Sequence, residues 1–409
     1  MMILFFGNRT QSQELESYLR IAEENNPDLK ASYSEFEANL ERTPQVSSLP
    51  DPTLTASAFG GMETLMGTEQ ANIQLMQMFP WFGTLRAKAQ TADLMAEAKY
   101  QAYLVRRNEM FFEVKKMYAE LYEIKETIDL KEENLEILDS YRELAMSKFR
   151  SGSSSMVNVV RIDIEREGAI TEIELLREEL ETMQKNFNLL LNRNMTAKVV
   201  IQDTLVFNKS SDEISAKDPF QNHPELQMID REVEANQSQA EVAQKEGLPM
   251  LGLGLEYTIF SKNDNASSPM NGQNMIMPMV SVSLPIFRKK YKAARKEAEL
   301  MQTASLQNRE ARKNQLQGVY EQTRYEFNKA EKLLDLYNRQ IQSSGQANKL
   351  LVSGFGNNTE EFEEVLRMNQ DILMLNTQKL AALKNGFIAQ AKLDYLSSKT
   401  ENYDENIKK

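Results

Sequence analysis

Two short stretches with a common pattern decide the fold, because each ends an alternating segment and precedes a long helical one. They read Gln77-Met78-Phe79-Pro80-Trp81-Phe82-Gly83 and Val282-Ser283-Leu284-Pro285-Ile286-Phe287. Upstream of each, apolar residues occupy every second position, which is the period of a β-strand with one apolar and one polar face. The alternation predicts strands at about 53–60, 71–79, 251–260 and 275–284, joined in pairs by polar loops over 60–70 and 261–273.

Working outward from these strands, the second half of the chain repeats the first. Asn26-Pro27-Asp28-Leu29 returns as His223-Pro224-Glu225-Leu226, a separation of 197 residues (223 minus 26). We therefore expect a first structural repeat over 14–192, a connector over 193–221, a second repeat over 222–400 and a tail over 401–409. Residues 1–13 are expected to be the remnant of a signal peptide or a disordered start.

Each repeat is predicted to hold a short, a very long and a third helix. The short helices, at 27–48 and 224–246, begin with proline after a polar residue, which suits the free N–H groups of a first turn. The long helices are predicted over 85–149 and 289–349, where proline is absent, and the third helices over 154–191 and 359–397. Turns around Gly152 and Gly354 would make each pair an antiparallel hairpin.

The apolar residues of these helices keep a seven-residue repeat, which is typical of coiled coils. In the second long helix and in the third helix of the first repeat they are Tyr320, Thr323, Phe327, Ala330, Leu334, Tyr337 and Ile341, and Ile173, Leu176, Leu180, Met183, Phe187 and Leu190. We expect these stripes to form the helix-packing core.

Composition excludes several classes of function. The 409 residues carry a net charge of −12 with a pI near 5.0, which argues against nucleic-acid binding. The chain has no cysteine and one histidine, His223, which we interpret as structural. No run of about 18 apolar residues predicts a membrane-spanning helix. No nucleophile–base set or phosphate loop indicates an enzyme, and no cofactor is expected.

The alternation of the strands points to a membrane. Strands of this length with one apolar face match those of outer-membrane barrels, although a half-buried sheet in a soluble domain would also alternate. The aromatic residues that bound the strands are typical of a membrane interface. Four strands cannot close a barrel and an open edge in lipid is forbidden, so the fold class we expect is mainly helical: a trimeric coiled-coil tunnel with a shared twelve-stranded β-barrel.

At this point the chain resembles a known family, the TolC-like outer-membrane efflux proteins. The resemblance rests on the duplicated order of elements, on the two strand-ending stretches quoted above and on the turns at Gly152 and Gly354, and it covers about residues 14–400. Within the family the chain is more similar to the heavy-metal branch, of the CusC and CzcC type, than to the drug branch.

The resemblance implies a transport function in which no chemical reaction takes place. Family members are homotrimers in the outer membrane of Gram-negative bacteria, with a helical tunnel in the periplasm. They conduct metal cations or drugs passively from an inner-membrane pump, often of the RND class, through a periplasmic membrane-fusion adaptor. The resemblance therefore predicts outer-membrane lipid, adaptor and pump as partners. The alternative is a periplasmic coiled-coil adaptor or scaffold without a channel.

The resemblance also suggests where the tunnel is narrow. The family narrows its entrance with acidic residues in a stretch that reads like Asp-Val-Leu-Asp, and the matching stretch here is Glu364-Val365-Leu366-Arg367. Glu360, Glu361 and Glu363 lie close by in the sequence. These five charged residues are either a cation-selecting entrance or a helix N-terminus that favours acidic side chains.

Five methionines fall on the polar face of the predicted strands, where they would point into a lumen: Met76, Met78, Met275, Met277 and Met279. Thioethers suit soft cations such as Cu(I) and Ag(I). Methionine is also a common filler of irregular space, so the pattern assigns no metal site.

Overall fold

The computed structural model describes residues 12–201, 204–207, 219–357 and 359–397. The expected tail over 401–409 and most of the expected start over 1–13 lie outside the described residues, as does part of the connector. The described chain divides into two compact units. Unit 1 takes its residues from 1–31, 104–224 and 313–409, and unit 2 from 32–103 and 225–312, so each unit draws on both sequence repeats.

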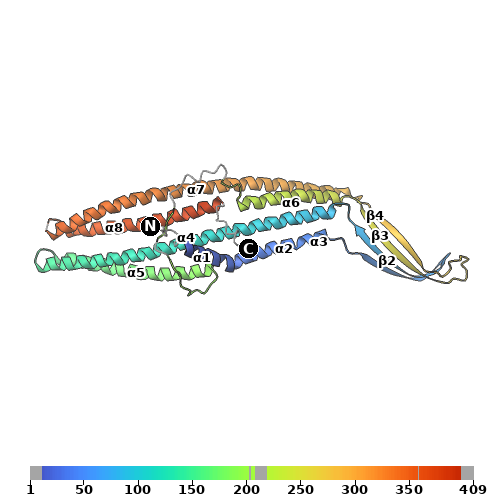
Figure 1. The fold of residues 1–409 in the computed structure, drawn as a ribbon, viewed down its shortest axis with the longest axis horizontal. Coiled ribbons are helices and arrows are strands. Elements are labelled where there is room, and N and C mark those ends of the chain that lie inside the picture. Colours follow the sequence, from blue (N-terminus) through green and yellow to red (C-terminus); the bar gives the residue numbers. More distant parts are fainter. Residues whose placement is uncertain (1–11, 202–203, 208–218, 358, 398–409) are drawn as a thin grey trace, which may run out of the picture. The chain divides into compact units, whose positions relative to one another are not determined.

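Unit 1 is built from helical hairpins (Figure 1). Helix α4 (Thr84–Arg150) turns back into α5 (Met156–Leu190), and α7 (Arg288–Gly356) turns back into α8 (Phe362–Leu396). Helices α4 and α7 run on without a break into unit 2. Gly318 lies inside α7, where a single glycine costs about 1 kcal/mol and does not end so long a helix.

The hairpin turns are set by local chemistry. Gly152 adopts φ 75° and ends α4, since a left-handed residue lets the last helical carbonyls be capped. The Ser155 side chain then accepts a hydrogen bond from the Val157 N–H and caps α5. In the second hairpin, α7 continues to Gly356, beyond the expected end at 349, and α8 starts at Phe362 instead of 359. The reason is Phe355, which is buried against Phe362 and holds the last turn of α7 in the core.

The predicted heptad stripes lie on the packed faces of the helices. Tyr320, Thr323, Phe327 and Ala330 are buried, and so are Ile173 and Phe187. An additional helix, α1 (Ser12–Asn25), was not predicted, and it packs through Tyr18 on Phe187. The spacing of its buried residues Tyr18, Leu19 and Ala22 is a helical signal that sequence reasoning missed.

Unit 2 contains a four-stranded antiparallel sheet and the helices that lead into it (Figure 1). The predicted helix over 27–48 is two helices, α2 (Pro27–Leu40) and α3 (Arg42–Ser47), whereas α6 (Pro224–Glu246) has its predicted bounds. The Asn26 side chain caps α2 by accepting from the N–H groups of Asp28 and Leu29. Two Arg–carboxylate pairs, Arg309 with Asp230 and Arg312 with Glu225, join α7 to α6.

The strands are β1 (Thr53–Thr64), β2 (Gly67–Phe79), β3 (Met250–Ser261) and β4 (Met275–Ser283), paired in that order. The expected loop over 60–70 is wrong. Both strands continue to a tight turn at residues 65–66, helped by positive φ at Gly61 and Gly67 and by a bulge between Ala58 and Met62. Among the described residues, no helix has both the length and the apolar character that crossing a membrane requires.

Candidate functional site

Two regions hold the residues that the sequence singled out. The first is the hairpin end of unit 1, which we define as the turns at 151–155 and at 357 and 359–361 with the adjoining helix ends. Its core contains Phe355, Phe362, Val365, Val159 and Ile162, all buried. Positions 362, 365, 366 and 369 of α8 are buried at helical spacing, so the acidic residues between them must point outward.

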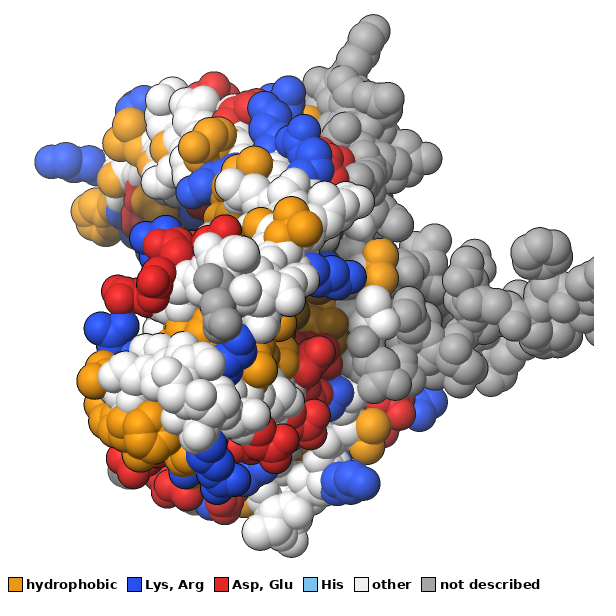
Figure 2. Space-filling view, turned by 90° about the vertical axis from the view of Figure 1, so that its left-hand side faces the viewer, with side chains coloured by type: hydrophobic (Ala, Val, Ile, Leu, Met, Phe, Trp, Pro, Cys, Tyr) orange, Lys and Arg blue, Asp and Glu red, His pale blue; other side chains and the backbone are white. Residues whose placement is uncertain are grey.

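The acidic residues at the start of α8 lie outside the buried positions, as the helical spacing predicts. Glu360, Glu361 and Glu363 are exposed and Glu364 is half-buried at the start of α8. Glu364 is bonded to Arg367 one turn further on, which is the same-helix pair that their spacing allows. Seen from this end of the chain, acidic, basic and hydrophobic side chains are intermixed over the surface (Figure 2). Glu363 and Glu364 also lie in the first turn of α8, where the helix dipole favours negative charge.

One ion pair at the hairpin end was not predicted. Arg161 on α5 donates to Glu363 on α8 over 2.8 Å and thereby joins the first hairpin to the second. This hydrogen bond, together with the charge of Arg161, lowers the pKa of the Glu363 carboxyl below its ordinary value of 4.5. Because the two residues are 202 positions apart, no local pattern in the sequence could have revealed the pair.

Further polar contacts hold the hairpin end together. Arg142 pairs with Asp163 over 2.6 Å between α4 and α5, and Lys148 donates to the Gly356 carbonyl over 2.7 Å. Deeper in the bundle, the Asn369 amide donates to the Asn134 side-chain oxygen over 2.8 Å, and both residues are buried. This pair lines a cavity of about 230 Å³ between α4, α5 and α8. A buried polar pair of this kind favours one register of the helices over others.

The second region is the sheet, whose register assigns every strand residue to one of two faces. The row Leu54, Leu75, Leu255 and Pro278 and the row Ala56, Ile73, Tyr257 and Ile276 belong to the apolar face. Its side chains are largely exposed in the single chain, with Val280 at 74% and Leu253 at 55%. An exposed apolar surface of this extent indicates a lipid or protein partner.

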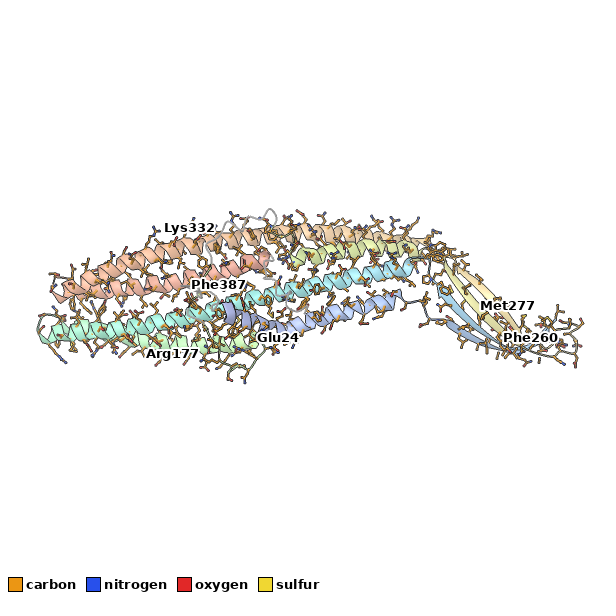
Figure 3. All side chains as sticks on the ribbon, in the orientation of Figure 1. Glu24, Arg177, Phe260, Met277, Lys332 and Phe387 are labelled. Carbon is orange, nitrogen blue, oxygen red and sulfur yellow. The ribbon has the colours of Figure 1, made fainter. Side chains whose placement is uncertain are left out.

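The opposite face carries all five predicted methionines. Thr55, Gln74, Glu256 and Met277 form one row across it, and Thr53, Met76, Gly254 and Met279 the next. Figure 3 marks Met277 on β4. The structure brings Met76 and Met78 together, since both sulfur atoms lie 3.7 Å from the Ser281 hydroxyl. Met275, Met277 and Met279 share their face without such a contact among the interactions described.

Two glycines of β3, Gly252 and Gly254, leave the space that the side chains of Met76 and Met78 occupy. A Cβ at Gly252 would lie 2.1 Å from the Ser281 Oγ and 2.6 Å from the Met78 sulfur, and one at Gly254 would lie 2.8 Å from the Leu75 carbonyl oxygen. Any larger side chain would therefore displace the methionines or the strand. Within the described ranges, no three His, Asp or Glu side chains are grouped as a metal ion would need.

His223, the one histidine, has the structural position that was expected. It is buried ahead of α6 and packs edge-on against the ring of Tyr395 in unit 1.

A mainly helical chain of long hairpins with a two-faced four-stranded sheet is the fold of known outer-membrane channels. The OprN outer-membrane channel matches with a TM-score of 0.77 at 16% identity, over 94% of this chain and 89% of OprN. CusC matches with 0.77 at 15% identity, over 96% and 95%, and VceC from Vibrio cholerae with 0.76 at 14% identity, over 94% and 96%. At these identities the likeness establishes the fold.

The chain belongs to the outer membrane efflux protein family, whose model matches residues 18–193 and 217–393. This match confirms the resemblance inferred from the sequence, and its two ranges fall largely one in each predicted repeat. No curated protein sequence matches the chain significantly. Because the structural matches to CusC and to other channels are equally close, they do not single out the heavy-metal branch.

Proposed function

We propose that three copies of this chain form a channel through the outer membrane of a Gram-negative bacterium, continued by a helical tunnel in the periplasm. The sheet is the observation that supports this most. It has an exposed apolar face, and within the described residues β1 and β4 are each paired on one side only. Lipid does not tolerate unpaired strand edges, so the edges must pair with other copies, and three copies supply twelve strands.

The channel would serve a tripartite efflux system. In this proposal an inner-membrane pump, such as one of the RND class, loads the cargo and a periplasmic membrane-fusion adaptor joins the pump to the hairpin ends. The cargo then diffuses out without a chemical step, so the chain acts as a conduit and not as an enzyme. Membership in the outer membrane efflux protein family supports this role.

The hairpin end is the entrance in this proposal. Glu360, Glu361, Glu363 and Glu364 from three copies would surround one axis with negative charge, which favours cations. Arg367 offsets part of that charge, and its pair with Glu364 keeps both side chains ordered. The Arg161–Glu363 contact joins the two hairpins of one chain and so opposes their separation when the entrance opens.

Heavy-metal cations or drugs are the cargo classes that the proposal covers. The convergence of Met76 and Met78 at Ser281 favours soft cations such as Cu(I) and Ag(I), because two thioethers can take such an ion in passing. Met275, Met277 and Met279 would extend the same sulfur-rich surface along the lumen.

Planar-bilayer recording of the purified protein tests the proposal. We expect stable single channels that prefer K⁺ to Cl⁻, with less preference after Glu364→Gln. A protein that never conducts and stays monomeric without detergent would support a periplasmic adaptor or scaffold instead. For the cargo, in a separate recording in chloride-free KNO₃, Ag⁺ added to one side should block the parent current more than that of a Met76→Leu, Met78→Leu double variant. Equal block of the parent and the double variant would show that Met76 and Met78 do not contact the cargo.

A further inference from the structure

A pocket of about 620 Å³ lies in unit 2 where the helices join the strands, and its lining residues include neither the five methionines nor residues of the hairpin end. Its wall combines the segments that connect α3 to β1, β2 to α4 and α6 to β3 with the first turn of α7. Ser48, Trp81, Leu248 and Tyr291 represent these four segments. The proposed channel does not use this pocket, so its polar groups call for a separate explanation.

The pocket contains an unsatisfied buried hydroxyl. Thr84 is 3% exposed and lines the pocket, and its Oγ1 has no hydrogen-bond partner among the described residues. Leaving a buried polar group unpaired costs about 1–3 kcal/mol, so such a group in a pocket indicates a missing partner. Thr84 is also the first residue of α4, a helix of 67 residues with a positive dipole end. The Thr84 N–H donates to the Trp81 carbonyl over 3.0 Å, so the N–H groups of Leu85 and Arg86 are the first-turn donors left for a ligand.

The charge around Thr84 suits an anion. Lys88, Lys245 and Lys290 line the pocket together with two acids, Asp51 and Glu246. Lys88 is paired with Glu246 over 2.7 Å. The Lys245 ammonium lies 2.9 Å from where a Cβ on Gly83 would be, directly at the start of α4, and pairs with Glu241 over 3.2 Å. Gly83 itself has φ 79°, so a side chain there would be both strained and in the way of this lysine.

The surroundings favour a lipid over a free ion. Val46, Leu49, Leu85 and Met250 contribute apolar wall to the pocket. Next to it, Phe82, Ile286 and Phe287 are strongly exposed, and Phe82 reaches 79%. Exposed aromatic residues at the end of an apolar strand face mark the headgroup level of a membrane. A phosphate with an apolar tail would thus match both parts of the wall.

We propose that this pocket binds the phosphate group of a membrane phospholipid. The Thr84 hydroxyl, the N–H groups of the next two residues of α4 and the Lys245 ammonium contact the phosphate. The apolar wall receives the glycerol and the first methylenes. The inference rests on the proposed function, because it requires the sheet to lie in a membrane.

Native mass spectrometry of the detergent-purified protein tests the pocket directly. Phosphatidylglycerol is titrated onto the parent, onto Thr84→Val, which keeps the shape and removes the hydroxyl, and onto Lys245→Met. Thr303→Val and Lys296→Met, on exposed positions of α7, are the matched controls. We expect about tenfold weaker retention of one lipid per chain in each pocket variant and parent-like retention in both controls.

A second titration adds inorganic phosphate as a competitor and distinguishes a lipid site from a site for a free anion. If phosphate displaces the lipid at equal concentration, the pocket binds a free anion and the lipid assignment is overturned. Equal lipid retention by parent and both pocket variants overturns the site altogether. Planar-bilayer conductance of the same samples keeps the two proposals apart. We expect parent and pocket variants to conduct alike, whereas a parent that fails to conduct would count against the channel and leave the lipid titration to be judged by its own result.

Discussion

Arg161 and Glu363 form the contact by which α5 and α8 are joined at the hairpin end. Because this pair connects the two hairpins of a chain, its loss should let them separate more easily. We expect Arg161→Ala to raise single-channel conductance by about twofold or more, as expected when a narrow entrance widens. Arg177→Ala is the matched control, since Arg177 pairs with Glu132 within the first hairpin. Unchanged conductance in both variants would place the constriction elsewhere.

The same pair predicts a pH dependence. The hydrogen bond from Arg161 lowers the pKa of Glu363 in the folded chain below 4.5, the value it has without a partner. The contact therefore contributes fully above pH 4.5 and is lost as the pH falls through the lower, folded pKa. We expect conductance to be constant from neutral pH down to about 4.5 and to rise in more acidic solution. The Arg161→Ala variant should lack that Glu363-dependent rise.

The packing of strand β3 leaves no room for a side chain at Gly252 and Gly254. At Gly252 a methyl group would meet the Ser281 hydroxyl and the Met78 sulfur, whereas at Gly60 of β1 it would meet nothing within 4 Å. Overpacking of this kind typically costs 1–3 kcal/mol. Gly252→Ala should accordingly lower the thermal-unfolding midpoint of the detergent-solubilised protein, and Gly60→Ala should leave it near the parent value. Equal midpoints would mean that Met76 and Met78 move aside freely.

The two faces of the sheet make a further prediction at two positions of β4. Val280 lies on the apolar face and Met277 on the opposite face, and both are exposed in the single chain, at 74% and 41%. Arginine at a lipid-facing position costs about 2–4 kcal/mol near the bilayer midplane, and a lumen position does not carry that cost. Val280→Arg should reduce the amount assembled in outer membranes, measured by membrane fractionation and heat-modifiable gel mobility. Met277→Arg should assemble and alter conductance; similar assembly defects would contradict the assignment of faces.

Periodic elements were predictable because their signal is local. Helices α4 and α7 and the alternation of β2 to β4 follow from side-chain spacing alone. The strand ends around Gly61 and Gly67 and the last turn of α7 at Phe355 depend on backbone conformation and on distant packing, which spacing does not encode. For the sites, the positions of Glu364 and the methionines could be predicted, since each follows from its own element. Arg161 and the pocket at Thr84 could not, because their partners come from segments far apart in the sequence.

Assembly is a property of the whole chain. Within the described residues one copy has four strands, and β1 and β4 are each paired on one side only, so we expect a trimer of three 47.0 kDa chains in detergent. Light scattering with detergent correction, or native mass spectrometry, measures this mass. A dimer or tetramer would give eight or sixteen strands and a different lumen, and a monodisperse monomer in the absence of detergent would refute the shared sheet.

The pairing of β2 with β3 also governs the order of folding. Phe79 faces Leu251 across this pair, so the centre of the sheet joins strands that are separated by the whole of α4, α5 and α6. Contacts so distant in sequence carry a large loop-closure entropy and form slowly, whereas helical hairpins form from near neighbours. Biosynthesis therefore exposes β1 and β2 long before their partner exists. We therefore expect the closure of the sheet, once β3 and β4 have been made, to be the slowest folding step of the chain.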